Sequence, residues 1–247
     1  MKITISRHRV RRLVAILLCV IAGNASAAAT DSFTATYSVS YGFLGLGTLS
    51  FQLKPGDKSD CYVYSGQGQP STLVSMLVGN LSDTSRFCVT EDGKIQPQYF
   101  RHHEEGAPND SYTLQFDWQD GTVRYQNRDG NIRVMALPQT ATDPLSLQVA
   151  ARMWVSNAED PKQLPNRDFT LVDEDEIKAY TLAVKPGGTI SVPAGRFDTV
   201  IVERVDDKDE TLRFWLARYA DWIPVRVQHE SDGRTITMNL KSLQRGK

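Results

Sequence analysis

The sequence predicts a mainly β protein, built as an antiparallel barrel or as a curved sheet or sandwich with two short helices. Apolar and polar residues alternate through most of the chain, as in the run 33–41 (FTATYSVSY), and a period of two is typical of half-buried strands. Turn-forming residues separate these runs at intervals of roughly eight to twelve residues, which favours a barrel or sandwich. Two of the breaks are Asp-Gly pairs, which are a common hairpin signal.

Residues 1–27 have the three zones of a secretory signal peptide. A basic start without acidic residues is followed by an unbroken apolar run over 13–22 (LVAILLCVIA) and by the small-residue sequence ASA. A membrane-spanning helix needs about 20 apolar residues, and this run is roughly half as long. We therefore expect cleavage between Ala27 and Ala28 and export to the periplasm of a Gram-negative bacterium. Residues 28–247 should form a single β-rich domain that does not span a membrane.

Cleavage also changes the net charge. The whole sequence has 28 basic and 29 acidic residues, and residues 1–27 contain five of the basic and none of the acidic ones. The mature chain therefore has 23 basic and 29 acidic residues, a net charge of −6. An acidic surface argues against a nucleic acid as the partner, and against binding anionic lipid headgroups by charge alone.

The first third of the mature chain is predicted as strands with one helix between them. After the strand 33–41, the segment 42–47 (GFLGLG) predicts a turn, and further strands follow at 47–53, 61–67 and 82–90. Between the last two, the apolar residues change to helical spacing. We expect a short amphipathic helix over 71–78 there, with Ser71 as its cap.

Two cysteines, Cys61 and Cys88, remain after cleavage because Cys19 leaves with the signal peptide. If the strands that flank the helix 71–78 run antiparallel, the two residues lie near the same level, and an oxidising compartment permits a disulfide between them. Such a bridge would be worth about 3–4 kcal/mol. The alternatives are two free thiols or a redox pair, although a redox pair usually has C-x-x-C spacing.

The middle of the chain is predicted as short strands followed by a clearer helix. Thr142-Asp143-Pro144 places a capping side chain before a proline at the first helical position, and apolar residues at helical spacing follow until a predicted end near Asn157. The strands are expected at 95–102, 112–118, 122–126 and 132–136.

The last third returns to strands. Residues 168–184 hold one long strand or two short ones around the acidic run 173–176, and Gly187-Gly188 predicts a turn. The remaining strands are expected at 189–192, 197–205, 211–217, 223–229 and 235–243.

No pattern in the sequence identifies a catalytic or metal site, and we expect neither a cofactor nor an enzyme. His102-His103-Glu104-Glu105 is the most conspicuous cluster, but neighbours on a strand point to opposite faces, so an exposed strand end is expected. His229 is expected to be an ordinary surface or hydrogen-bonded histidine. The acidic runs 173–176 and 206–210 are expected to be solvated turns, and the serine-hydrolase pattern G-x-S-x-G is absent.

Six motifs, in order over about 33–243, resemble the exported bacterial family known as domain of unknown function 3108. The resemblance implies an exported, mainly antiparallel β protein without an established activity, and it supplies no catalytic residues. The cysteine pair is not one of its motifs. The segments that carry the resemblance are Tyr37-x-Val39 with Gly42 and Gly47, then 83–87 (DTSRF), 97–100 (PQYF) with Glu105-Gly106, 143–146 (DPLS), 192–198 (VPAGRFD) with Val202-Glu203, and 214–217 (FWLA) with 223–226 (IPVR).

Three functions stay open at this point. The first is a periplasmic binding or carrier module that holds an apolar or amphipathic ligand, such as a lipid. The second is an envelope structural or assembly factor that binds another protein through a strand edge or helix face. The third is a hydrolase with an unrecognised carboxylate site. An apolar pocket beneath the helix 71–78 would favour the first, a packed interior with an exposed apolar patch the second, and carboxylates or histidines converging in a cleft the third.

Overall fold

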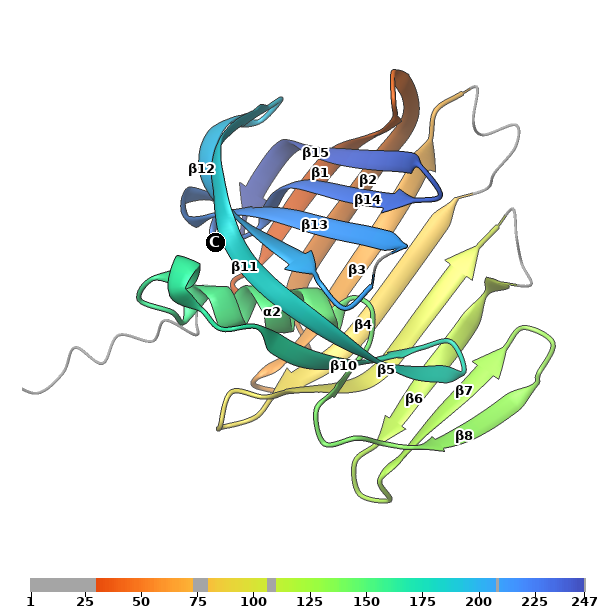
Figure 1. Ribbon diagram of the computed structural model, residues 1–247. Coiled ribbons are helices and arrows are strands. Elements are labelled where there is room, and N and C mark those ends of the chain that lie inside the picture. Colours follow the sequence, from red (N-terminus) through yellow and green to blue (C-terminus); the bar gives the residue numbers. More distant parts are fainter. Residues whose placement is uncertain (1–29, 73–79, 106–109, 208, 247) are drawn as a thin grey trace, which may run out of the picture.

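The computed structural model describes residues 30–72, 80–105, 110–207 and 209–246, which form a large curved sheet with the helix α2 (Ser146–Ser156) against it (Figure 1). The predicted fold class is confirmed, and the sheet is unclosed. Short 3-10 turns lie at η2 (Pro161–Gln163) and η3 (Arg218–Ala220). The strands are β1 (Phe33–Tyr41), β2 (Leu44–Pro55), β3 (Cys61–Pro70), β4 (Leu81–Val89), β5 (Ile95–Glu104), β6 (Tyr112–Asp117), β7 (Thr122–Asn127), β8 (Ile132–Ala136), β9 (Ala141–Thr142), β10 (Arg167–Asp173), β11 (Glu176–Val192), β12 (Gly195–Arg204), β13 (Glu210–Ala217), β14 (Pro224–Ser231) and β15 (Arg234–Arg245).

Neighbouring strands in the sheet are mostly neighbours in the sequence, because hairpins connect them. The order is β8-β7-β6-β5-β4-β3-β2-β1-β15-β14-β13-β12-β11-β10-β9. The first strand therefore pairs with the last one in the middle of the sheet, with Phe33 opposite Arg245. The pairs are antiparallel except for β9 and β10, which run parallel over two residues.

The alternation of residue types places one face of each strand in the core. In β1, Phe33, Ala35 and Tyr37 are buried, and the residues between them are only partly covered. The same face continues on β4 to β7, where the apolar side chains Phe87, Phe100, Leu114 and Val123 are almost completely inaccessible. Each such side chain contributes about 1.5–3 kcal/mol through its removal from water.

The helix α2 joins two parts of this core. Leu145, just before it, and Val149 pack in a large cluster formed by β1 to β7 with parts of β10 and β13 to β15. Trp154 and Val155 pack in a second cluster with β10 to β13. The helix therefore buries apolar side chains against both halves of the curved sheet, and this explains why its sequence is apolar over more than one narrow stripe.

The predicted cap of this helix is present. Asp143 is completely buried, and its carboxylate accepts hydrogen bonds from the backbone N–H groups of Leu145 and Ser146, both at 2.9 Å. The Ser85 hydroxyl of β4 donates a third bond to the same carboxylate at 2.6 Å. The cap thus fixes the start of the helix to the sheet, and the helix ends next to Asn157 as expected.

Two predicted turns are wrong in their extent. The turn over 42–47 is shorter than expected, because β2 begins at Leu44 and Gly47 already pairs with Val39 and Pro70. The pair Gly187-Gly188 is not a turn between strands, because β11 runs through it with a shift in register against β12. In both places glycine allows an irregular strand to continue: φ is +146° at Gly47 and +64° at Gly188. Residues 73–79, which hold most of the predicted helix 71–78, lie outside the described residues.

Candidate functional site

A cleft of about 840 Å³ lies where both ends of the described chain meet the β2–β3 turn, the β4–β5 turn and the helix α2. Several apolar side chains line it, among them Phe33, Tyr62, Val89 and Ile223. Its polar lining includes Arg152, Arg245 and four carboxylate residues, Asp31, Asp60, Glu91 and Asp221. The cleft therefore combines apolar walls with charges of both signs.

Arg152 is the most buried charged group of the cleft, with 4% of its surface exposed. Its Nε donates to the backbone carbonyl of Asp221 at 2.7 Å, and its guanidinium carbon lies 5.1 Å from the ring centre of Phe33. Burial lowers the pKa of Arg152, although an arginine stays charged in proteins. The helix α2 thus holds a cation in the floor of the cleft.

The C-terminal end of the chain is fastened to the same place. Arg245 donates from Nε to the Asp221 carboxylate at 2.5 Å and from a terminal nitrogen to the carbonyl of Tyr219 at 2.8 Å. Asp221 has a left-handed backbone with φ of +54°, which turns the chain from η3 into β14. The carboxylate of Asp221 is therefore balanced by Arg245, and the remaining acidic residues of the cleft lie on its other walls.

The predicted disulfide is present beside the cleft. Cys61 of β3 lies directly opposite Cys88 of β4, and their sulfur atoms are bonded at 2.10 Å. The residues next to them, Asp60, Tyr62 and Val89, line the cleft. The bridge therefore holds together two strands that form one wall. The predicted cleavage site at Ala27 and Ala28 lies outside the described residues.

The histidine cluster differs from the sequence prediction. His102 is not part of an exposed strand end: 21% of its side chain is exposed, its Nδ1 lies 2.7 Å from Asp83, and its ring packs against Tyr112. The hydrogen bond to Asp83 raises the pKa of His102. His103 has a different partner, the Ser111 hydroxyl at 3.4 Å, so the alternation along the strand is as expected. None of these residues lines the cleft.

The acidic run 173–176 is a turn, as predicted, but it is bound to the opposite half of the sheet. The Tyr112 hydroxyl of β6 donates to the Asp173 carboxylate, and Arg133 of β8 donates to Asp175 at 2.9 Å. Burial is the main cause that raises the pKa of Tyr112. The two halves of the unclosed sheet are thus connected by side chains across its opening.

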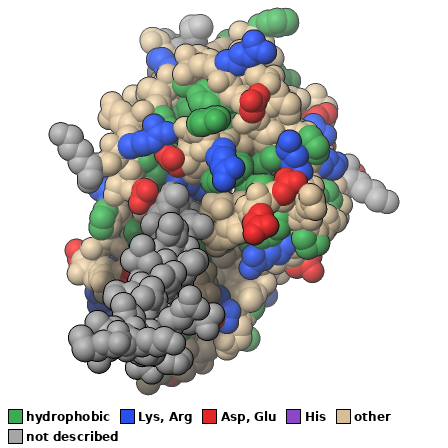
Figure 2. All heavy atoms as spheres, turned by 90° about the vertical axis from the view of Figure 1, so that its left-hand side faces the viewer, with side chains coloured by type: hydrophobic (Ala, Val, Ile, Leu, Met, Phe, Trp, Pro, Cys, Tyr) green, Lys and Arg blue, Asp and Glu red, His purple; other side chains and the backbone are tan. Residues whose placement is uncertain are grey.

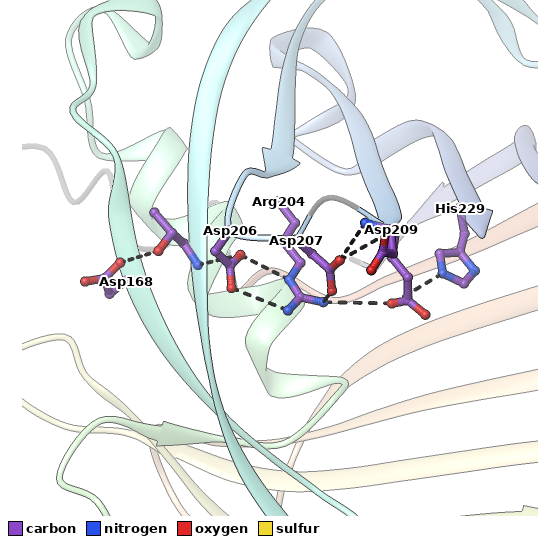
Figure 3. Close-up of polar contacts among 8 residues, drawn as sticks. Asp168, Arg204, Asp206, Asp207, Asp209 and His229 are labelled. Carbon is purple, nitrogen blue, oxygen red and sulfur yellow. Dashed lines mark hydrogen bonds and ion pairs between the residues drawn. The ribbon is translucent and has the colours of Figure 1, made fainter. Parts of the chain in front are cut away.

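The described acidic residues of the run 206–210, which are Asp206, Asp207, Asp209 and Glu210, belong to a polar network at the β12–β13 hairpin (Figure 3). Arg204 is its centre, with nitrogen–oxygen distances of 3.1 Å to Asp206, 3.0 Å to Asp207 and 3.8 Å to Glu210. His229 lies 4.0 Å from Glu210 and is partly exposed. Ion pairs at the surface contribute at most about 1 kcal/mol each, so the network orders the hairpin rather than marking a site. Basic and acidic side chains are also interspersed on the molecular face in Figure 2.

Within the described ranges, no group of three or more histidine, cysteine or acidic side chains is arranged to hold a metal ion. The same ranges contain no helix that is long and apolar enough to cross a membrane. The charged residues of the cleft, Arg152 above all, were not predicted from the sequence. One signal pointed to it: Arg152 follows Val149 by three positions and so lies on the apolar face of the predicted helix.

The profile of the family described as "Protein of unknown function (DUF3108)" matches residues 36–241. The chain belongs to this DUF3108 family. The resemblance seen in the sequence motifs is therefore confirmed, and the description of the family assigns no activity. No curated protein matches the sequence. The crystal structure of a β-barrel-like protein of domain of unknown function DUF1849 from Brucella abortus is similar, with a TM-score of 0.56 and 16% sequence identity over 88% of this chain and 98% of that chain. This likeness concerns the fold alone.

Proposed function

We propose that this DUF3108 protein is an exported, periplasmic binding or carrier protein, without catalytic activity, for an amphipathic ligand such as a lipid. The observation that carries the proposal is the cleft of about 840 Å³. Pockets that bind small molecules usually measure about 300–1,000 Å³ and combine apolar walls with a few polar groups. The cleft is in this size range and has apolar side chains, although polar groups make up more of its lining than in such pockets.

The lining of the cleft supports an amphipathic rather than a purely apolar ligand. Phe33, Tyr62 and Ile223 offer apolar surface, and Arg152 offers a buried positive charge among them. A ligand with a polar headgroup could place an acceptor near the guanidinium and its apolar part against the rings.

Two features fit an extracytoplasmic carrier. Residues 1–27 have the pattern of a cleaved signal peptide, and disulfides persist in the periplasm. The bridge between Cys61 and Cys88 would keep the wall of the cleft in shape in that compartment.

Native mass spectrometry of the mature protein, purified from a periplasm without detergent, tests the proposal. A lipid or other small molecule should accompany the protein at near-stoichiometric level, and organic extraction would identify its class. Arg152→Met should lower the occupancy, whereas Arg213→Met, which changes a residue outside the cleft, should not. A clean mass of the ligand-free, disulfide-bonded chain would argue against a carrier.

One observation favours the second candidate, an assembly factor that binds another envelope protein. The strand β8 is an end strand of the described sheet, and its Ile132 and Val134 are 51% and 60% exposed. Such an edge can accept an added strand from a partner. Crosslinking in the envelope should then yield a protein adduct that disappears with Val134→Lys.

A further inference from the structure

A second pocket, of about 440 Å³, lies between the C-terminal half of α2, the start of β5 and the strand β10. Gly93 lines this pocket and the cleft, so the β4–β5 turn lies between the two hollows. The lining of the second pocket is mixed. Its apolar part comes mainly from Ile95, Ala150, Met153, Trp154, Leu164 and Phe169, and about half of its residues are polar, among them Asp92 and Asp168. One water molecule occupies about 30 Å³ in the liquid, so the pocket volume of about 440 Å³ equals that of about 15 water molecules.

Trp154 gives this pocket a specific polar group. Its side chain is 8% exposed and packs edge to face on Phe169, with 5.8 Å between the ring centres. Among the described residues its indole N–H has no protein acceptor, and its nitrogen is not among the buried atoms that lack a partner, so solvent reaches it. By contrast, the indole N–H of Trp118 donates to the carbonyl of Pro97 at 2.6 Å. The N–H can therefore donate to an acceptor that enters the pocket.

Arg167 adds a positive charge at the rim. Its guanidinium carbon lies 5.2 Å from the ring centre of Phe169, and it forms no ion pair with a described carboxylate. The other basic residue of the rim, Lys94, is already paired with Asp92 at 2.7 Å. Arg167 is therefore the cation of this pocket that can balance an incoming negative charge.

We propose that this pocket is a second binding site, separate from the cleft, for a small apolar carboxylate. The apolar body of the ligand lies against Met153, Trp154 and Phe169. One carboxylate oxygen accepts a hydrogen bond from the Trp154 indole N–H, and Arg167 balances the charge. The site does not depend on the proposed carrier function, because its lining shares only Gly93 with the cleft.

Isothermal titration calorimetry of the mature, disulfide-bonded protein with 2-naphthoate tests the site. Wild type should bind one equivalent. Trp154→Phe keeps an aromatic ring against Phe169 but removes the N–H, so 2-naphthoate should bind at least tenfold more weakly, which corresponds to about 1.4 kcal/mol. Trp215→Phe is the matched control, because Trp215 lies in β13 and does not line the pocket. Its affinity should equal that of wild type.

A second comparison separates the role of charge from that of shape. Arg167→Gln should weaken 2-naphthoate but leave its uncharged methyl ester unaffected. This exposed position can be changed without disturbing the core, so the test holds even if the tryptophan variant is less stable. The proposal is overturned if wild type does not bind 2-naphthoate, if both tryptophan variants bind it equally, or if Arg167→Gln weakens the acid and the ester alike.

Discussion

Asp143→Asn should remove a large part of the dependence of stability on pH. Burial raises the pKa of Asp143 to about 6, against the hydrogen bonds from Ser85 and from the helix start, which lower it. The carboxyl of an unfolded aspartate titrates near 3.9, so the difference is about 2 pKa units, or about 3 kcal/mol. Because the folded state holds the proton more tightly, this stabilisation is fully present below about pH 3.9 and is lost as the pH rises through about 6.

The asparagine variant keeps the acceptor for the N–H groups of Leu145 and Ser146 but carries no charge at any of these pH values. Relative to wild type, its free energy of unfolding should therefore rise by about 3 kcal/mol between pH 4 and pH 7.5. Asp143→Ala is the control, because it removes the cap and leaves the buried Ser85 hydroxyl without its acceptor. It should be about 2–4 kcal/mol less stable than the asparagine variant at both pH values.

Urea unfolding of the three disulfide-bonded proteins at pH 4 and pH 7.5 gives the required free energies. Other carboxyl groups also titrate in this range, and the hydrogen bonds that lower the pKa of Asp92 change stability in the opposite direction. Their effect is the same in each protein and cancels in the difference. Parallel pH profiles for wild type and Asp143→Asn would refute the reasoning.

Three further predictions concern the bridge, a glycine and the histidine. Joint replacement of Cys61 and Cys88 by serine should lower the free energy of unfolding, measured with urea, by about 3–4 kcal/mol, because the bridge closes a loop with a sequence separation of 27. An unchanged free energy of unfolding would mean that the bond is absent from the native protein. Gly47→Ala should lower the free energy of unfolding by about 2–4 kcal/mol, because a Cβ there would clash with the backbone carbonyl oxygen of Gln69. An unchanged midpoint of thermal unfolding would contradict that contact. NMR titration should give His102 a pKa above 6.5 that falls in Asp83→Asn. The stabilisation by this pair should be present below pH 6.5 and disappear as the pH rises through the folded-state pKa; equal pKa values in both proteins would contradict the pairing.

Much of the fold was predictable because the signals are local. Alternation over 33–41 predicts the bounds of β1, and Asp143 before Pro144 predicts the start of α2 to within two residues. The errors arise where pairing with a neighbouring strand determines where a strand begins or ends. Leu44 belongs to β2 because its neighbour β1 extends to Tyr41, and β11 continues through Gly187 because β12 pairs with it on both sides of the irregularity.

The candidate site was much less predictable. Its wall combines Phe33, Tyr62, Arg152, Ile223 and Arg245, which are far apart in the sequence and meet only through the curvature of the sheet. The disulfide was the exception. The strands β3 and β4 follow each other in the sequence and pair antiparallel, so Cys61 and Cys88 lie opposite each other. His102 was misjudged because its burial depends on Tyr112 of the next strand, and spacing along β5 does not show this.

The pairing of β1 with β15 has a consequence for the order of folding. A chain that emerges N-terminus first, from a ribosome or from a translocation channel, delivers β1 at once but its partner only at the end, since Phe33 pairs with Arg245. The hairpins β2 to β8 can form early from local contacts, whereas the central seam must wait for the last residues. Contacts between distant residues form slowly. A chain that is truncated or paused near its C-terminus would therefore leave the backbone N–H and C=O groups on one side of β1 unpaired. Such an edge can pair with another chain, so the incomplete chain should be most prone to aggregation late in its synthesis.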